Sequence, residues 1–329
     1  MDKIIYGVPK IGWETGMYST FHGSLWAVLQ ALGDPKPYHY LMGISGHAFR
    51  VQTFEPFICP CSPDATCGFN TGEVALRALG YDYVYRFGKE DDPSVSEMRK
   101  LIVESIDKGI PVIAIDLRKV PDWGVIVGYK KGGEEFLCRT YHDDSDEYST
   151  NEKWPWVIYV LERKKEERRT REELVLNSLR IAIKLAHTEK FPIGDNFLKS
   201  GFAALEHWIA HLENETYYQS LEKEELSNAR LYNAWNYASL INARDCAVRY
   251  LQDEANTLKA SREDMLYAAK IYSQVVDVLE KGRKYALHPW EEGPWGPEER
   301  RKEIEVLKEV LNLEKEAIEA ITEVVKRYE

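Results

Sequence analysis

The sequence predicts an α+β protein whose second half is helical, and three observations lead to this class. Up to about residue 162, segments with the period of amphipathic helices precede short runs rich in β-branched and aromatic residues. Beyond residue 162 the β-type runs almost vanish. Helices that precede a group of strands, instead of alternating with them, disfavour a dinucleotide-binding fold and favour an antiparallel sheet. We therefore expect an α+β domain over 1–162 and an all-helical domain over 163–329.

Three helices are expected in the first domain, and their ends have chemical reasons. They cover residues 21–32, 71–79 and 94–108. Ser19 or Thr20 can cap the first of them, and Gly33 ends it. The third helix starts with the capping-box pattern of Ser94 and Glu97.

Four β-type runs follow these helices. They cover residues 111–117, 123–129, 135–141 and 156–161. The middle two are separated by Lys130-Lys131-Gly132-Gly133, which suits a hairpin turn. The runs therefore predict an antiparallel sheet.

The second domain follows a mixed-charge run over 163–169, which we interpret as a solvated connector or helix flank. Its helices are expected over 171–187, 196–213, 226–258 and 262–283, and the last begins at Gly296-Pro297. Apolar residues of the last helix form a nearly heptad seam that Glu314 interrupts. An intramolecular helical partner is favoured over a dimeric coiled coil, and a homo-oligomer stays open.

Composition and charge exclude several classes of function. The 329 residues contain 54 acids and 43 bases, a net charge of −11, which disfavours a general binder of nucleic acid or of anionic membranes. No run approaches the roughly 18 apolar residues of a membrane span, and the start lacks a secretory signal. We expect a cytoplasmic protein. Neither GxxxxGK[ST] nor GxGxxG occurs, and no cofactor is expected.

Three of the five cysteines gather in one proline-rich segment. Cys59 and Cys61 flank Pro60, and Cys67 follows. A metal site would need a fourth ligand from His47, Cys138 or His142. The spacing is not that of a zinc ribbon, so we favour an oxidisable loop or an occasional disulfide over a metal.

His207 and His211 lie four residues apart in a predicted helix and could share a metal ion. The glutamate of the HExxH motif is missing, and no third ligand is evident nearby. No metal site is assigned to the chain.

The segment 13–24 contains the densest group of polar and aromatic residues, and it leads into the first helix. Unpaired amides and the helix dipole stabilise negative charge at such a start. A nucleophile or an anion site belongs at such a start, but serine and threonine also cap ordinary helices.

Several segments resemble a known family. Residues 20–33 and 40–49 resemble the N-terminal domain of the butirosin biosynthesis protein H family. Residues 109–116 and 123–129 are similar to the strand pair that carries the catalytic histidine in its superfamily, and 201–209 looks like a helical region of bacterial relatives. The resemblance implies a papain-like fold related to bacteriocin leader peptidases.

The resemblance also implies an acyl-transfer or amide-cleaving site with a cysteine at a helix start, a histidine base and an orienting Asp or Asn. Here the cysteine position falls at or beside Thr20, and the histidine position falls near Asp122. The third position falls on Tyr141-His142-Asp143. The candidate catalytic residues are Thr20, Ser19, His22, Asp122 and Asp143.

We expect this protein to bind a small molecule or peptide in a cleft between its domains, on a papain-like scaffold that has lost the thiol. The expected ligand-binding residues are Trp13, Tyr18, His47, Trp123, His142, Tyr232 and Trp235. One alternative is an active acyltransferase or amide hydrolase with a repurposed Ser/Thr-Asp-His site. The other is a non-catalytic subunit that interacts through its helical domain.

Overall fold

The computed structural model describes residues 2–90, 92–164 and 169–329, and the chain divides into two compact units. Unit 1 comprises Met1–Leu41 and Ala75–Arg168, and unit 2 comprises Met42–Val74 and Arg169–Glu329. Residues 42–74 thus group with the C-terminal helices, whereas the expected domain boundary after residue 162 includes them in the first domain. Residues 165–168 of the predicted connector lie outside the described residues.

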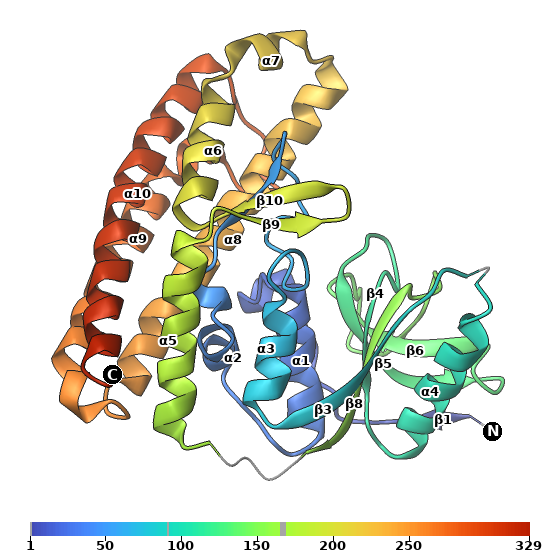
Figure 1. Cartoon of the computed structure of the whole chain (residues 1–329). Helices are drawn as coiled ribbons and strands as arrows, with labels where there is room; N and C mark the ends of the chain where they lie inside the picture. The colour runs from blue at the N-terminus through green and yellow to red at the C-terminus, as the bar shows by residue number, and fades with distance from the viewer. Residues whose placement is uncertain (1, 91, 165–168) are drawn as a thin grey trace. The chain divides into compact units, whose positions relative to one another are not determined.

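Unit 1 contains a seven-stranded antiparallel sheet (Figure 1). The strand order is β3-β8-β4-β5-β6-β7, and β1 pairs with β5 off this path. The strands are β1 (Lys3–Ile4), β3 (Tyr81–Phe87), β4 (Val112–Ile115), β5 (Trp123–Lys130), β6 (Glu135–Arg139), β7 (Ser149–Thr150) and β8 (Val157–Lys164). The predicted antiparallel sheet is confirmed, with its four predicted strands at β4, β5, β6 and β8.

Two helices cover opposite faces of this sheet. The helices wholly inside unit 1 are η1 (Trp13–Thr15), α1 (Thr20–Ala31) and α4 (Val95–Asp107). Helix α4 packs on Val112 and Ala114, which point to one face. On α1, the Phe21 ring contacts the rings of Trp123 and Tyr159, with centroids 5.1 and 5.3 Å away. Because side chains alternate along a strand, these two rings lie on the other face.

Unit 2 is mainly helical. Its helices are η2 (His47–Phe49), α5 (Arg171–His187), α6 (Gly201–Glu213), α7 (Glu215–Ser220), α8 (Lys223–Glu254), η3 (Lys259–Ser261), α9 (Arg262–Ala286) and α10 (Pro297–Lys326). The two short helices α2 (Tyr38–Ile44) and α3 (Thr71–Ala78) each continue from one unit into the other. Helix α10 packs along α9 (Figure 1) and also contacts α5 and α6. The predicted intramolecular partner of the last helix is thus confirmed.

Among the described residues, no helix meets the length and apolarity that a membrane span requires.

The expectation of an all-helical C-terminal domain is wrong at one place. A hairpin of β9 (Lys190–Ile193) and β10 (Asn196–Ser200) joins β2 (Gln52–Glu55) in a three-stranded sheet. Gly194 makes the turn with a φ of 55°, which favours glycine. Gly201, with a φ of 57°, then separates β10 from α6, so the helix expected over 196–213 begins five residues later. The long-range pairing with β2 stabilises strands that the local pattern does not reveal.

Candidate functional site

Ser19 and His22 are hydrogen-bonded to each other at the start of α1. Ser19 is the N-cap residue, but its hydroxyl does not cap the helix. Instead, Ser19 Oγ lies 2.8 Å from His22 Nδ1. Both residues are buried, with exposures of 8% and 0%. An N-cap serine ordinarily accepts a hydrogen bond from an amide of the first turn, so here the helix start lacks that cap.

Thr20 contacts the beginning of strand β5, although the two segments are far apart in the sequence. The backbone N–H of Trp123 donates to Thr20 Oγ1 over 3.3 Å. Asp122 directly precedes Trp123, so the structure brings Thr20 close to the turn that carries Asp122, the two positions singled out by the family resemblance. This geometry places a hydroxyl and a carboxylate-bearing turn beside the start of α1.

Asp122 and His142 form a second pair. His142 Nε2 lies 3.0 Å from Asp122 Oδ2, and each side chain is 23% exposed. The turn that carries His142 is held by Arg118, whose Nη1 donates to the His142 carbonyl over 2.7 Å. The pair can present a donor and an acceptor to a ligand, and a carboxylate can fix the orientation of the imidazole.

Asp143 occupies a different position from the one expected. Its carboxylate is fully buried and accepts hydrogen bonds from Thr140 N and Oγ1, at 3.2 and 2.9 Å. Arg139 Nη1 lies 3.4 Å from the other oxygen. Asp143 therefore holds the turn after β6, and the carboxylate that contacts an imidazole belongs to Asp122.

Aromatic rings lie beside these polar pairs. The Trp13 ring centroid is 4.4 Å from that of Tyr141 and 6.0 Å from that of Tyr18. Trp13 and Tyr18 are half-buried, so a ligand could stack on them. Trp123 is 1% exposed, and its ring belongs to the core of unit 1. The ring packs on Phe21 in the core, and the backbone amide of Trp123 contacts Thr20.

Sequence reasoning missed the roles of two tyrosine hydroxyls. The backbone N–H of Ser19 donates to Tyr38 Oη over 2.9 Å. Tyr141 Oη is buried and has no hydrogen-bond partner within the described part of the chain. Burial raises the pKa of Tyr141 well above its usual value, and Asp122 and Glu14 add to this shift. No local pattern marks either hydroxyl, because the surroundings of each form only when segments distant in the sequence meet.

Three of the predicted ligand-binding residues belong to unit 2, whereas the others belong to unit 1. His47 is buried, and its Nδ1 lies 2.8 Å from Thr71 Oγ1. Tyr232 lies on α8, and its carbonyl accepts from an asparagine one turn later. Trp235, also on α8, meets the Trp290 ring edge-on at 6.2 Å.

None of the five cysteines lies on α1, and two of them form a disulfide. Cys59 and Cys61 are joined by a disulfide, whereas Cys67, Cys138 and Cys246 are free. Burial raises the pKa of Cys67 and of Cys138 to about 12, so these thiols ionise little at neutral pH. Among the residues that the structure describes, no three His, Cys, Asp or Glu side chains are grouped to hold a metal ion.

His207 and His211 stack on α6 with their ring centroids 6.3 Å apart. His207 Nδ1 lies 2.9 Å from Thr53 Oγ1. Burial and the neighbouring His207 lower the pKa of His211 to about 4, so it is neutral at physiological pH. The pair belongs to the packing of α6 against β2.

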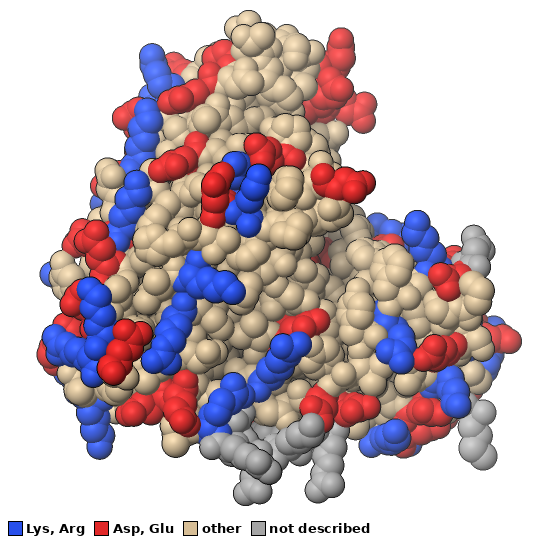
Figure 2. Space-filling view, in the orientation of Figure 1, with Lys and Arg blue, Asp and Glu red and all other residues tan. Residues whose placement is uncertain are grey.

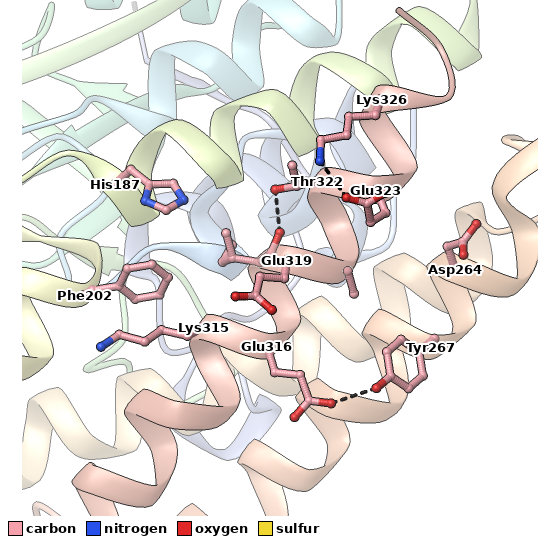
Figure 3. A pocket seen from close by; sticks show the side chains of 12 residues that line it. His187, Phe202, Asp264, Tyr267, Lys315, Glu316, Glu319, Thr322, Glu323 and Lys326 are labelled. Atoms are coloured by element: carbon pink, nitrogen blue, oxygen red, sulfur yellow. Dashed lines mark hydrogen bonds and ion pairs between the residues drawn. The ribbon is translucent and has the colours of Figure 1, made fainter.

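Unit 2 also has an open groove of about 760 Å³ along α10 (Figure 3). His187 and Phe202 lie on one side of it and Tyr267 on the other. Its polar groups already bind one another: Tyr267 Oη donates to Glu316 over 2.8 Å. Such a lining does not define a particular ligand.

Two comparisons with known proteins, by family model and by sequence, found no relative. No protein-family model matches the sequence, and no curated protein is detectably similar to it.

Proposed function

We propose that unit 1 is a papain-like scaffold that binds a small molecule or peptide at the start of α1, without the thiol chemistry of that superfamily. The hydrogen bond between Trp123 N and Thr20 Oγ1 supports this, because it joins the helix start to the turn that carries Asp122. A threonine hydroxyl ionises far less readily than a thiol, so Thr20 is suited to binding rather than attack.

The chemistry of the site favours a ligand that carries a carbonyl or carboxylate oxygen. The start of α1 favours negative charge, and Ser19 does not cap it. The partly exposed Asp122–His142 pair adds one acceptor and one donor. Trp13 offers an apolar ring for the remainder of the ligand.

Surface charge is consistent with a small-molecule or peptide ligand rather than a nucleic acid. On the face shown in Figure 2, Lys and Arg side chains lie among Asp and Glu side chains instead of forming one basic patch. The net charge of −11 likewise disfavours binding of a nucleic acid. Binding of nucleic acid relies on a clustered basic surface.

Ligand-induced stabilisation tests this proposal. We expect members of a set of N-acetyl amino acids and N-acetyl dipeptides to raise the thermal unfolding midpoint in a saturable manner. Asp122→Asn should increase the half-saturating concentration roughly ten-fold, since it weakens a charge-assisted hydrogen bond. Asp144→Asn is the matched control, because that exposed aspartate pairs only peripherally with Arg118 and Lys119. Equal weakening by both variants, or no stabilisation by any probe, would contradict the proposal.

A second candidate function is acyl transfer or amide hydrolysis from Ser19, and the Ser19–His22 hydrogen bond favours it. In this reaction His22 takes the Ser19 proton while Oγ attacks a carbonyl carbon, and the imidazole then protonates the leaving amine. Water or an acceptor amine would release the acyl group from the serine ester.

A fluorophosphonate probe distinguishes the second candidate from simple binding. If Ser19 is a nucleophile, the probe labels it covalently, and Ser19→Ala abolishes both the labelling and any hydrolysis of aminoacyl p-nitrophenyl esters. Ser24→Ala is the control, because Ser24 is a buried serine on the same helix. Labelling that persists in Ser19→Ala would remove Ser19 from the mechanism and leave the binding function unaffected.

A further inference from the structure

Arg50, in unit 2, is a buried cation whose side-chain hydrogen bonds go to backbone carbonyls. It is 5% exposed. Its Nη1 donates to the carbonyls of Cys67 and Phe69 at 3.2 and 3.1 Å. Its Nη2 donates to the carbonyls of Pro63 and Asp64 at 2.9 and 2.5 Å. These bonds all go to backbone carbonyls, so within the described residues no carboxylate is hydrogen-bonded to the guanidinium, although Asp64 acts on it electrostatically.

A cavity of about 30 Å³ lies beside Arg50. Its polar wall consists of His47, Arg50, Gln52, Asn236 and Ser239, and none of the described lining residues carries a carboxylate. A single water needs roughly 10–15 Å³ of such space, so the cavity suits a species of about one to three heavy atoms.

Two side chains at this wall have buried polar atoms without a hydrogen-bond partner among the described residues. Gln52 is 4% exposed, and neither its Nε2 nor its Oε1 has a hydrogen-bond partner among the described residues. Ser239 Oγ is likewise buried and unpartnered there. Because buried polar groups in native proteins are nearly always satisfied, these atoms point to a bound species.

We propose that this cavity binds a small monovalent anion, with Gln52 Nε2 and Ser239 Oγ as donors and Arg50 as the countercharge. A buried cation, two available donors and the lack of a lining carboxylate favour an anion over water and over a metal cation. The volume restricts the class to a halide or a carboxylate as small as formate. The inference concerns unit 2 and is independent of the function proposed for unit 1.

The other charges near Arg50 are already engaged. Asp64 acts electrostatically on Arg50, but its Oδ1 accepts hydrogen bonds from Thr66 N and Oγ1 at 2.8 and 2.6 Å. Arg244 donates through Nη1 to the Arg50 carbonyl over 3.0 Å and forms a buried ion pair with Glu314. Asp64 thus offsets part of the Arg50 charge without a hydrogen bond to the guanidinium, and the charge of Arg244 is paired with Glu314.

Thermal unfolding of the full chain in sodium salts of constant ionic strength tests this inference. Gluconate is too large for the cavity, so sodium gluconate gives the baseline midpoint. Chloride, bromide or formate then replaces gluconate stepwise. We expect a saturable rise in the unfolding midpoint with an anion that fits. Gln52→Leu and Ser239→Ala should each raise the half-saturating concentration roughly ten-fold, because each removes a hydrogen bond to a charged group.

Ser261→Ala is the matched control, since Ser261 Oγ is also buried and unpartnered in the described chain but does not line the cavity. It should leave the half-saturating concentration unchanged. If the unfolding midpoint saturates with halides but not with formate, the cavity binds a spherical anion. If formate gives the lower half-saturating concentration, the cavity binds a carboxylate. The proposal is overturned if no anion exceeds gluconate, or if Ser239→Ala titrates like the parent chain. If Gln52→Leu does not fold, Ser239→Ala and bromide anomalous diffraction from crystals decide the question.

Discussion

At the scale of single residues, the structure explains why position 23 is a glycine, although no sequence pattern indicates a need for glycine there. Gly23 lies in the first half of α1, where alanine would ordinarily favour the helix by about 1 kcal/mol. A Cβ at this position would lie 1.9 Å from Tyr141 Oη. The absence of a side chain therefore allows the buried tyrosine to approach the helix backbone, next to the candidate site.

We predict that Gly23→Ala destabilises the protein by roughly 1–3 kcal/mol despite the better helix propensity, because the methyl group overlaps the Tyr141 hydroxyl. Tyr141→Phe should be neutral or stabilising without ligand, since it removes a buried hydroxyl with no partner in the described structure. The double variant should recover much of the loss. Denaturant unfolding of the four proteins measures this, and strictly additive effects would contradict a direct overlap.

At the scale of elements, local patterns predicted helix ends well where the side chains face solvent. The capping box of Thr170 and Glu173 forms as its spacing indicates. Ser94 and Glu97 have the same spacing, yet Ser94 does not cap α4. Its hydroxyl is buried without a partner in the described structure, and its backbone N–H donates to Asp92 Oδ1 over 2.8 Å. A local turn thus competes with the capping box, as short polar side chains commonly do.

The glutamate that interrupts the apolar seam of α10 also has an explanation in the structure. Glu314 forms a buried ion pair with Arg244 of α8. Arg244 Nη1 in turn donates to the carbonyls of Ala48 and Arg50, at 2.9 and 3.0 Å. This network joins α8, α10 and the end of η2, so the charged residue is part of the packing of unit 2.

We predict that Arg244→Met and Glu314→Leu each destabilise the protein by about 3–5 kcal/mol, because each leaves the other charge buried and unpaired. The double variant should be less destabilised than the sum of the two, since apolar side chains can replace a buried pair at little cost. Urea unfolding midpoints with unchanged m-values measure the coupling. If the two losses simply add, the charges do not act as a pair.

At the scale of the whole molecule, the sequence was most informative where the signal is local. The predicted sheet of unit 1 and the bounds of α5 follow from periodicity and caps. The proximity of Thr20 and the start of β5 was predicted through a family resemblance rather than through any local pattern. The pairing of β2 with β10 and the cavity beside Arg50 were not predicted, because each combines segments far apart in the chain.

The pH dependence of stability should contain a contribution from one buried carboxyl. Glu303 is fully buried and accepts hydrogen bonds from Asn233 Nδ2 and Trp295 Nε1, at 2.8 and 3.2 Å. Burial raises its pKa from 4.5 to about 7. Between these two values the folded state binds more protons than the unfolded state, so this group makes the protein less stable as the pH rises.

The buried His211 changes the stability with pH in the opposite direction to Glu303. A comparison of Glu303→Gln with the parent chain therefore isolates the contribution of Glu303. The lowered pKa of His211 costs stability as the pH falls from about 6.5 to about 4, so the two effects partly cancel in the parent chain. The amide resembles the protonated carboxyl and does not titrate. Relative to the parent, we expect Glu303→Gln to gain roughly 3 kcal/mol of unfolding free energy between pH 4.5 and pH 8. Urea unfolding at several pH values measures this difference, and a pH-independent offset between the two proteins would show that Glu303 titrates normally.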